Sequence, residues 1–525
     1  MKHKLKIGVL IDNTQLEHYK VEILKEVQKS DFCEITKFIK LKPEQEKQNS
    51  KYLFYRLFNK VDTKLFGRGT QYLSLESIED IINSCNKEEE PEIIINLSSS
   101  IKHYPNDTKY GMWQFVYNSN PTGYWEVVKN TPFTEVTLQK SGSGFENGLI
   151  LKTFKTATER KSMIKNKDIV AWRSHMMMIR ELKKLALNGE KYFEDKKAII
   201  NFSHEQSSNE RKFFDPQHKF NDTKHRQPPT NWEMVKVVCK LLKKYTIFSI
   251  RKLYPSDRWL ILYSETKNSE INPKLSEYKR LYAPSLDYFW ADPFIVDEKD
   301  KSYLFFEELD YSTYKGYLKV CEYENGNFKE PKMVLEEDYH LSYPNVFKVS
   351  DKYYMVPESS ENRTIDLYES VGFPTKWKKV RTLIDDISAV DATFLYRDKK
   401  WWMFVSVIEK EGFSTDDELC IYYSDDILTG EWTPHVQNPV VCDVTCSRPA
   451  GNLIEKNGKL YRPAQDCSGM YGRKMVINEI DILNEHEYKE HVVSEINSDF
   501  AEDLTGIHTL NSSKKLTVID AIKSR

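Results

Sequence analysis

Two aspartates, each at the start of a short strand, are the first candidates for chemistry in this sequence. Asp292 lies in LDYFWADPFIVDEKDKSYLFFEE, between Trp290 and an apolar run, and Asp391 opens DATFLYRDKKWWMFVSV. Strands are depleted in aspartate, and an acid among aromatic residues is costly to desolvate unless it is paired or used. The alternative is that each aspartate caps a neighbouring turn. We treat both as candidate catalytic residues.

The two aspartates share one register of a pattern that recurs five times from residue 286. Each copy has a short apolar strand, a polar turn and a second, aromatic-rich strand. The copies open at Asp292, Tyr343, Asp391, Ala450 and Gly506, so their spacings are 51, 48, 59 and 56 residues. Repeats of about 50 residues with about four strands each are typical of β-propellers. Five copies therefore predict an all-β propeller of five blades over residues 256–525.

The innermost strands of propeller blades line one central channel, so the residues that open these strands should converge. Neighbours on a strand point to opposite faces, so Glu307 and Glu308 cannot both face the channel, and the same holds for Gln465 and Asp466. The arrangement predicts a polar, aromatic-rimmed cup of the kind that binds sugars. The predicted substrate-binding residues are Trp290, Glu308, Tyr343, Arg448, Arg462, Gln465 and Asp466, and Glu358 is a third candidate catalytic residue.

The motif WADPF resembles the five-bladed sugar-acting propellers, which include arabinanases, xylosidases, invertases and mannoside phosphorylases. This resemblance implies that Asp292 is the base or nucleophile of the first blade and that Asp391 tunes pKa values. The general-acid glutamate of the hydrolases falls on Ala450, beside Arg448. An arginine there favours a substrate that bears phosphate.

Without an acid at position 450, protonation of a leaving group would need another residue, such as Glu358 or Asp466.

A closer resemblance comes from WADPF, FFEE, YPNVF, DATFLY, SRPAGNL, NGKLYRPAQDCSGMYG and GIHTL. Over roughly residues 280–520 these motifs are similar to the N-terminal propeller domain of the plant glucosamine inositolphosphorylceramide transferases. In those proteins the transferase activity is attributed to a separate domain, so the resemblance implies a glycan context more firmly than a defined reaction.

Residues 1–200 predict a separate α/β domain. Strands are expected at 6–12, 34–42 and 91–100, and helices at 18–30, 75–87 and 168–193. Strands that alternate with helices imply a parallel sheet. Residues 201–255 are predicted to be a linker and a connecting helix, because 203–230 are polar and interrupted by prolines. The helix predicted at 229–254 has a Thr230/Asn231 cap, and its lysines favour either docking on the next domain or contact with a membrane surface.

The segments EIIINLSS, YGMWQF, GYWEV, TEVTLQ and NGLIL resemble the formyltransferase fold of methionyl-tRNA and sugar-amine formyltransferases. The catalytic Asn-x-His pair of that family falls on Gln114 and Val116, and its aspartate falls on Glu146 or Asn147. Valine cannot carry a proton, so we expect a degenerate domain without formyltransferase activity. His103 lies nearby but does not fit the spacing.

Composition limits the remaining classes. The chain has 525 residues and a net charge of −2, which does not indicate nucleic-acid binding. No apolar run reaches 18 residues and no signal-peptide core follows the N-terminus, so a cytoplasmic protein, peripheral to the inner membrane face at most, is expected. Cys442, Cys446 and Cys467 permit a zinc site, but no histidine cluster follows them, and reduced thiols are the favoured interpretation. We expect no cofactor and no metal.

Three functions remain open. The first is a glycosyltransferase of surface-polysaccharide or glycoconjugate biosynthesis that uses an activated phosphate-sugar donor. Its partners would be a sugar or nucleotide sugar and a lipid-linked acceptor. The second is a glycoside hydrolase or phosphorylase that uses Asp292 with Glu358 or Asp466. The third is a non-catalytic glycan-binding scaffold, which Val116 and Ala450 would favour.

Overall fold

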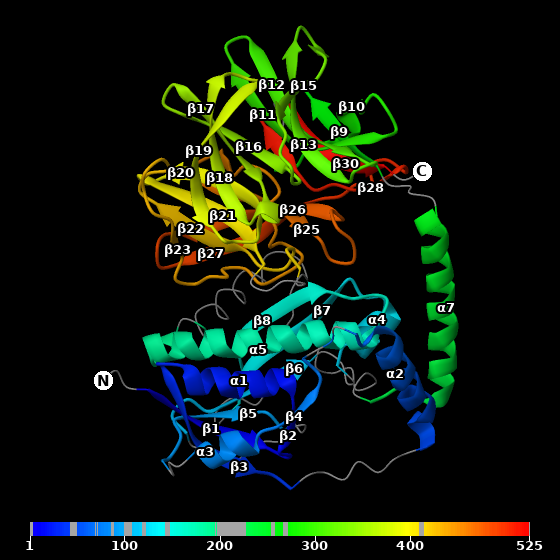
Figure 1. The fold of residues 1–525 in the computed structure, drawn as a ribbon, viewed down its shortest axis with the longest axis vertical. Helices are drawn as coiled ribbons and strands as arrows, with labels where there is room; N and C mark the ends of the chain where they lie inside the picture. The colour runs from blue at the N-terminus through cyan, green and yellow to red at the C-terminus, as the bar shows by residue number, and fades with distance from the viewer. Residues whose placement is uncertain are drawn as a thin grey trace. The chain divides into compact units, whose positions relative to one another are not determined.

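A computed structural model describes most of the chain and divides it into two compact units, Met1–Ser249 and Ile250–Arg525 (Figure 1). The described residues are 4–42, 50–68, 70, 72–85, 89–98, 108–117, 122–141, 148–194, 196, 227–253 (backbone alone at 247–253), 258–265, 271–408 and 414–523. Each unit has its own sheets and its own buried core, and each is described by itself.

The first unit is built on a six-stranded mixed sheet in the order β3-β1-β5-β6-β7-β8. The first four of these strands pair in parallel and the last two antiparallel. The central strands are apolar and almost wholly buried because helices cover the sheet. The strands are β1 (Leu5–Ile11), β3 (Cys33–Lys40), β5 (Ile93–Asn96), β6 (Met112–Tyr117), β7 (Phe133–Ser141) and β8 (Leu149–Ala157).

The helices of this unit follow the predicted alternation with two differences. The helix predicted at 75–87 begins only at Glu79, because Leu75–Ser77 (β4) pairs with Gln15–Glu17 (β2). Two further helices, α2 and α4, were not predicted. The helices are α1 (His18–Lys29), α2 (Leu53–Phe66), α3 (Glu79–Ser84), α4 (Tyr124–Lys129) and α5 (Met163–Asn188), with a short 3-10 turn at Ser50–Tyr52.

The likeness of this unit to formyltransferases stays a prediction, since the structure shows a mixed α/β unit and no more. Gln114 and Val116 lie on β6. Gln114 is buried, and its amide oxygen accepts a hydrogen bond from Asn96 at 3.3 Å. The other proposed counterparts, Glu146 and Asn147, lie outside the described residues, as do His103 and most of the predicted linker.

Helix α7 (Asn231–Leu253) follows, and its start is a capping box. The Thr230 N–H donates to the Glu233 carboxylate at 2.8 Å, and the Glu233 N–H donates to Thr230 Oγ1 at 3.4 Å. The predicted cap at Thr230 is therefore present. No helix among the described residues is long and apolar enough to cross a membrane.

The second unit is a five-bladed β-propeller, as the repeats predicted. Blade 1 holds β11 (Tyr288–Glu298), β12 (Lys301–Asp310), β13 (Lys315–Glu324), β14 (Asn327–Phe328) and β15 (Lys332–Leu335). Blade 2 holds β16 (Ser342–Val349), β17 (Lys352–Glu358), β18 (Thr364–Gly372) and β19 (Lys376–Asp385). Blade 3 holds β20 (Ala389–Arg397), β21 (Lys400–Val407), β22 (Cys420–Ser424) and β23 (Thr433–Pro434). Blade 4 holds β24 (Ile454–Lys456), β25 (Lys459–Asp466), β26 (Lys474–Leu483) and β27 (Tyr488–Ile496).

Blade 5 closes the ring with strands from both ends of the unit. It joins β9 (Arg258–Ser264) and β10 (Lys279–Leu281) to β28 (Leu504–Gly506), β29 (Leu510–Ser512) and β30 (Thr517–Lys523). The pairing of β9 with β30 runs from Arg258 opposite Lys523 to Ser264 opposite Thr517. This closure ties the two ends of the unit together, which protects sheet edges that would otherwise be free to pair with another chain.

Each neighbouring pair of blades shares one buried apolar cluster. Blades 1 and 2, for example, meet at Phe294, Phe305 and Tyr343, and blades 5 and 1 meet at Ile261, Trp290 and Phe306. Similar clusters lie between blades 2 and 3, 3 and 4, and 4 and 5. Burial of one such side chain contributes roughly 1.5–3 kcal/mol, so these five seams fix the blades against one another. All eight cysteines are free, and none forms a disulfide.

Candidate functional site

Three blades open with a residue in the left-handed backbone region. The φ angles are +50° at Asp292, +44° at Tyr343 and +57° at Asp391. Each residue sits in a break of the strand register, between Ala291 and Phe294 in the first blade and at the equivalent places in the next two. Bulges of this kind re-aim side chains, and a non-glycine residue in this region costs of order 1–3 kcal/mol. The same strained backbone conformation therefore occurs at all three predicted site residues that open these blades.

Tyr343 links the inner strands of three blades. Its side chain is fully buried and stands edge-on to Phe294. Its hydroxyl lies 2.8 Å from Thr393 Oγ1 and accepts the N–H of Gly451 at 2.6 Å. Gly451, at φ +113°, takes the strained backbone position in blade 4, directly after Ala450. These bonds show Tyr343 as a support of the channel wall.

A chain of asparagine side chains completes this wall. Asn345 donates to Asn452 Oδ1 at 2.7 Å, the Asn452 N–H donates to Asn511 Oδ1 at 2.8 Å, and Asn511 donates to the Pro293 carbonyl at 2.8 Å. Asn511 stands in the fifth blade where Asn345 and Asn452 stand in theirs. The residue two positions earlier, Thr509, is therefore the counterpart of Asp292, whereas Gly506 ends β28.

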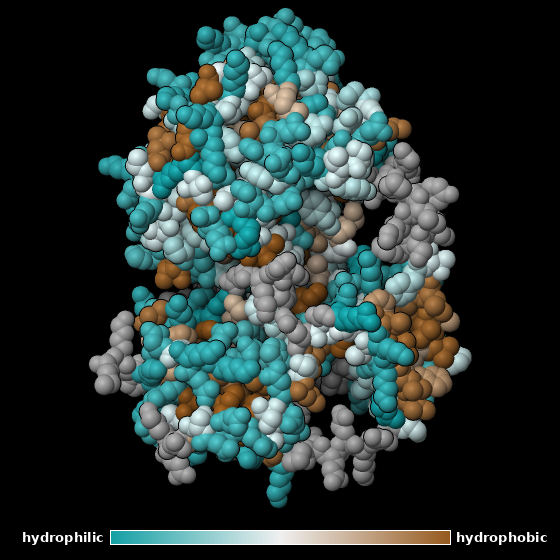
Figure 2. Space-filling model, in the orientation of Figure 1, coloured by the Kyte–Doolittle hydropathy of each residue, from teal (hydrophilic) through white to brown (hydrophobic). Residues whose placement is uncertain are grey.

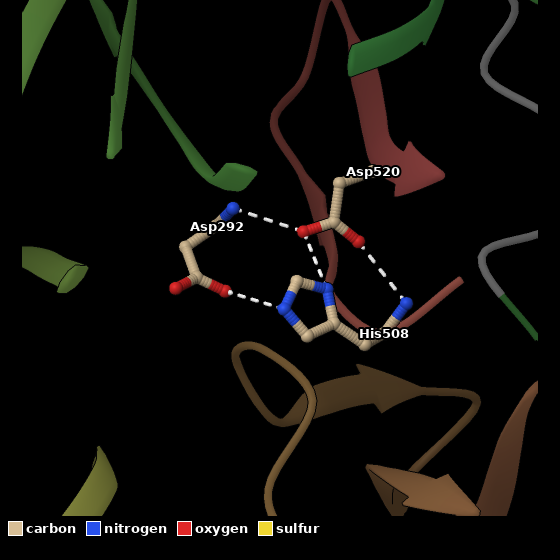
Figure 3. Close-up of side chains that lie close together, drawn as sticks. All are labelled: Asp292, His508 and Asp520. Carbon is tan, nitrogen blue, oxygen red and sulfur yellow. Dashed lines mark hydrogen bonds and ion pairs between the residues drawn. The ribbon is translucent and has the colours of Figure 1, made fainter. Parts of the chain in front are cut away.

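Asp292 is buried at the start of blade 1, and Figure 3 shows it beside His508 and Asp520. Its carboxylate accepts the N–H of Tyr343 at 3.2 Å and the hydroxyl of Thr509 at 2.9 Å, and His508 Nε2 lies 3.4 Å away. Its own N–H donates to Asp520 at 2.9 Å. Burial raises the pKa of Asp292 to about 6, with His508 opposing the shift and the charges of Asp520 and Asp391 adding to it.

His508 lies between two carboxylates. Nδ1 is 2.6 Å from Asp520, and Nε2 faces Asp292. The ring stacks on Trp259 with 3.9 Å between centroids. Burial alone would lower the pKa of His508, but the charges of Asp520 and Asp292 outweigh it and raise the pKa. The arrangement favours an imidazolium that balances the charge of Asp292.

Asp292, His508 and Asp520 place one potential ligand atom each within 4.8 Å of one another, so this is where the described residues could hold a metal ion. The same atoms already form ion pairs, with His508 Nδ1 2.6 Å from Asp520 and Nε2 3.4 Å from Asp292. Asp520 accepts the N–H groups of Asp292, His508 and Thr509 at 2.9 to 3.1 Å. We therefore interpret the group as an ion-paired network that positions Asp292.

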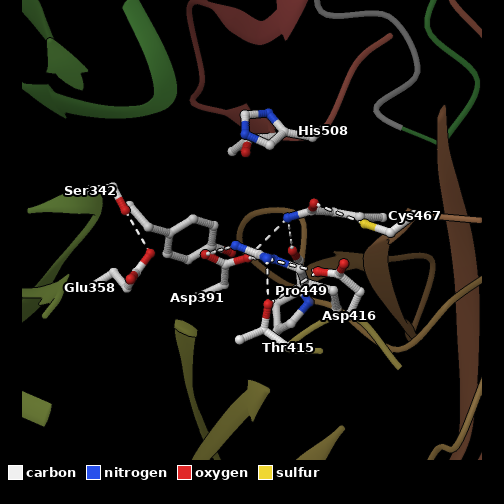
Figure 4. A network of polar contacts seen from close by, with 12 residues as sticks. Ser342, Glu358, Asp391, Thr415, Asp416, Pro449, Cys467 and His508 are labelled. Atoms are coloured by element: carbon white, nitrogen blue, oxygen red, sulfur yellow. Dashed lines mark hydrogen bonds and ion pairs between the residues drawn. The ribbon is translucent and has the colours of Figure 1, made fainter. Parts of the chain in front are cut away.

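A second network surrounds Asp391 (Figure 4). The buried carboxylate of Asp391 accepts Arg448 Nε at 2.6 Å and Gln465 Nε2 at 2.9 Å. Arg448 Nη1 donates to Thr415 and Asp416, both at 2.9 Å. Burial opposes the charge of Arg448, but Asp391 and Asp416 outweigh it and raise its pKa. Asp391 therefore orients a permanently charged guanidinium.

Tyr471 covers this guanidinium, whose carbon lies 4.8 Å from the centre of the ring. The same tyrosine is edge-on to His508, with centroids 5.2 Å apart, and is 41% exposed. Aromatic faces of this kind stack on cations and sugars. Tyr471 therefore joins the two networks and reaches the solvent.

Glu358 is the last residue of β17 and is half-buried. It accepts the Ser342 hydroxyl at 2.7 Å. Burial and the charge of Asp391 raise the pKa of Glu358 to about 7, against the opposing charge of Arg448. This carboxyl group therefore keeps its proton closer to neutral pH than a free glutamate does, which suits a proton donor.

Of the two neighbouring glutamates in blade 1, Glu307 is the one coupled to the site. Burial, with the charges of Asp292 and Glu358, raises the pKa of Glu307 well above its usual range. Glu308 points the other way and accepts the Trp290 indole N–H at 2.6 Å and the Tyr317 hydroxyl at 2.7 Å. Glu308 and Trp290, both predicted to bind substrate, are thus bonded to each other within blade 1.

Arg462 and Asp466 are likewise engaged inside blade 4. Arg462 is 1% exposed, pairs with Glu490 through Nε at 2.9 Å and Nη2 at 2.6 Å, and donates to the carbonyls of Cys446 and Ser447. Asp466 accepts the Ser468 N–H at 2.9 Å. Burial raises the pKa of Asp466. The structure brings Asp391, Arg448 and Gln465 together and leaves these two in separate contacts.

Sequence reasoning missed the contributions of His508, Asp520, Asp416, Tyr471 and Trp259. His508 had one signal, the motif GIHTL in the fifth copy, which places a histidine between β28 and β29. Asp520 lies on β30 and Trp259 on β9, so only the closure of the ring brings them to the site.

Comparison with known proteins matches residues 271–521 to the family model of glucosamine inositolphosphorylceramide transferase 1, N-terminal. The transferase of that name from Oryza sativa subsp. japonica is 38% identical over 206 residues, which are 38% of this chain and 27% of the relative. The Arabidopsis thaliana protein is 34% identical over 206 residues, with the same coverage. The match thus spans about a quarter of the length of these curated relatives.

Solved structures of low identity are also similar. The family 117 glycoside hydrolase Zg3597 of Zobellia galactanivorans is 10% identical, with 50% of this chain and 90% of that chain covered and a TM-score of 0.34. A GH43 endo-arabinanase from Bacillus licheniformis is 13% identical, with 46% and 96% covered and a TM-score of 0.32. Over residues 271–521 the propeller is therefore similar in sequence to the N-terminal domain of glucosamine inositolphosphorylceramide transferase 1.

Proposed function

We propose that the propeller transfers a sugar from an activated phosphate donor during glycoconjugate or surface-polysaccharide assembly. The observation that carries the proposal is a pair of carboxyl groups with raised pKa values, about 6 at Asp292 and about 7 at Glu358, in one electrostatic network with Arg448. Burial disfavours the ionised form of both groups, so both can exchange a proton near neutral pH. The matched relatives are named as transferases, but the match covers only 27% of their length, so their name supports a glycan context for this propeller.

In this reaction Asp292 acts as the base. It takes the proton from an acceptor hydroxyl, and the freed oxygen forms a bond to the anomeric carbon of the donor sugar. The bond between that carbon and the donor phosphate breaks, and its electron pair leaves with the phosphate. His508 keeps Asp292 ionised until it accepts the proton, because its positive charge lies 3.4 Å from the carboxylate.

Arg448 balances the charge that develops on the leaving phosphate. Its Nε and Nη1 are held by Asp391, Thr415 and Asp416, and Nη2 makes only a 3.5 Å contact with Asp391. That nitrogen is the donor available to a phosphate oxygen, and Glu358 in its protonated form supplies a second donor. Arg462 has no part in this scheme because Glu490 and backbone carbonyls occupy its donors.

Glycoside hydrolysis or phosphorolysis is the second candidate, favoured by one observation. Glu358 is half-buried and has a pKa raised to about 7, which suits a general acid that protonates a leaving alkoxide. Glu358 would then replace the acid that is missing at Ala450. A non-catalytic sugar-binding role is the third reading and would use the same residues without turnover.

The test combines binding and turnover on the full chain. A panel of nucleotide sugars is screened by thermal shift against the wild type, Arg448→Lys and Asp292→Asn, and product formation with glycan and lipid-linked acceptors is followed in parallel. We expect one donor to raise the Tm of the wild type, Arg448→Lys to weaken that shift, and Asp292→Asn to bind the donor without turnover. Asp287→Asn, a change at an exposed aspartate of the same strand region, is the matched control.

The alternatives give different results. If the wild type releases free sugar from glycosides and both Asp292→Asn and Glu358→Gln lose this activity, the propeller is a hydrolase and not a transferase. If both variants still bind sugar and no product forms under any condition, the propeller is a non-catalytic scaffold. If no donor shifts the Tm of the wild type, the phosphate-sugar donor is wrong.

A further inference from the structure

Helix α2 carries two apolar faces, and only one of them packs inside the protein. Tyr55 and Phe58 face inward, against a buried cluster that includes Tyr124 and Met163. The outer face is exposed by 43% to 67% and follows a spacing of four residues, so it forms one stripe along the helix. Its residues are Leu53, Phe54, Leu57, Val61 and Leu65.

Helix α7 repeats this arrangement. Met234, Val237 and Leu241 are buried in the same cluster as Tyr124. On the outside, Trp232 is 70% exposed, Val235 41% and Leu242 62%, and Cys239 is exposed between them. The spacings of three, four and three residues place these side chains on one face. The fold of the unit does not need this stripe, because the opposite face already anchors the helix.

The two stripes form one surface. The Phe54 N–H donates to Asn231 Oδ1 at 2.9 Å, and Asn231 Nδ2 donates to the Ser50 carbonyl at 3.0 Å, so the starts of α2 and α7 are joined. Farther along, Phe66 stacks on Tyr245 with centroids 6.1 Å apart. The helices lie side by side in Figure 1, and Figure 2 shows their apolar side chains gathered there. Contiguous exposed apolar patches mark binding surfaces.

The charges on this surface are of one sign. The exposed charged side chains of α2 and of residues 231–246 of α7 are all lysines: Lys60, Lys64, Lys236, Lys240 and Lys243. The two acidic residues are engaged elsewhere. Asp62 is buried and accepts from Ser162 and the Ile164 N–H at the start of α5, and Glu233 closes the capping box of α7.

We propose that α2 and α7 dock this unit on an anionic lipid bilayer. Charge complementarity selects the occupant: apolar stripes flanked by lysines alone match acyl chains beneath acidic headgroups. The helices would lie in the plane of the interface, with the stripes buried about 5–10 Å and the lysine stems extending to the phosphates. Trp232, whose ring has Lys236 Nζ 6.0 Å from its centre, suits the headgroup level. This inference does not depend on the reaction proposed for the propeller.

The test is flotation of the full chain with vesicles of phosphatidylcholine alone or mixed with phosphatidylglycerol. We expect binding to the mixed vesicles that weakens as salt rises. Lys60→Gln with Lys64→Gln should weaken it by roughly 30-fold, since each lysine near an anionic surface contributes about 1 kcal/mol, or about fivefold. Leu57→Glu with Leu65→Glu should abolish it. Leu187→Glu, at a leucine of α5 that is 63% exposed, is the matched control and should bind like the wild type.

A second readout guards against misfolded variants. An environment-sensitive dye on Cys239 should shift to the blue on mixed vesicles and not on phosphatidylcholine alone, and a Cys239→Ser sample corrects for labelling elsewhere. The proposal is overturned if the wild type ignores mixed vesicles, or if binding survives Leu57→Glu with Leu65→Glu. A dimer of the wild type that these changes dissociate, without vesicle binding, would assign the surface to a second copy of the chain.

Discussion

Replacement of Asp292 by asparagine should stabilise the protein at neutral pH while it removes activity. The pKa of Asp292 is about 6 in the folded state, against an ordinary value of 3.8, because burial disfavours the ionised carboxylate. At pH values between these two pKa values, the carboxyl group binds more protons in the folded state than in the unfolded state. The free energy of unfolding therefore falls as pH rises from about 4 to about 6 and is level above.

The size of this effect follows from the difference in pKa. A difference of about two pKa units, at 1.36 kcal/mol each, corresponds to roughly 3 kcal/mol of lost stability above pH 6. Asparagine has no charge to bury and keeps an acceptor for the Tyr343 N–H, but it fits the Thr509 hydroxyl and His508 less well, which costs about 1 kcal/mol. We expect a net gain of about 1–3 kcal/mol at pH 8 and none at pH 4.

Urea unfolding of the wild type and of Asp292→Asn across this pH range measures the gain, and Asp287→Asn is the control. Asp287 is exposed, so its replacement should stay within about 0.5 kcal/mol at every pH. The reasoning is refuted if Asp292→Asn destabilises the protein equally at pH 4 and pH 8. That result would mean that the carboxylate is held by its hydrogen bonds and is not disfavoured by burial.

Three other changes test the supports of the site. Arg448→Met should destabilise by about 3–5 kcal/mol, because it leaves the buried charge of Asp391 unpaired, and Asp391→Asn in the same chain should recover part of this loss in urea unfolding. Tyr343→Phe should cost about 1–3 kcal/mol, since the Gly451 N–H loses its acceptor; an unchanged unfolding midpoint would contradict this. Arg462→Met should also cost about 3–5 kcal/mol in urea unfolding, but a folded sample should bind sugar ligands as the wild type does, whereas a specific loss of binding would restore Arg462 as a substrate residue.

The sequence allowed the five-bladed fold to be predicted because its determinants are local. Each copy carries its strands and turn within about 50 residues, so the period is visible without any long-range contact. The same locality explains why Asp292, Tyr343 and Asp391 could be placed in one register. Blade 4 also followed, because Gly451 adjoins the predicted Ala450 and has the same left-handed backbone.

The fifth blade could not be read in the same way because two distant segments build it. Trp259 comes from β9 and Asp520 from β30, and nothing near either residue signals the other. The hydrogen bond from Thr509 to Asp292 spans 217 positions. The choice between neighbours such as Glu307 and Glu308 was open for another reason: alternation allows one residue of a pair to face the channel, but the strand's absolute orientation decides which one.

The network around Asp292 explains why the propeller must be closed to have a site at all. Asp292 is held by Tyr343 of blade 2 and by Thr509 and His508 of blade 5, and its backbone is held by Asp520. The left-handed backbone of Asp292 and the burial of its carboxylate both lower the stability of the folded state. Contacts with the neighbouring blades must therefore offset this cost. The pairing of β9 with β30 completes blade 5, which packs on blade 1 through Ile261, Trp290 and Phe306, close to where these contacts converge. A change that loosens this closure should therefore impair the site before it unfolds the other blades.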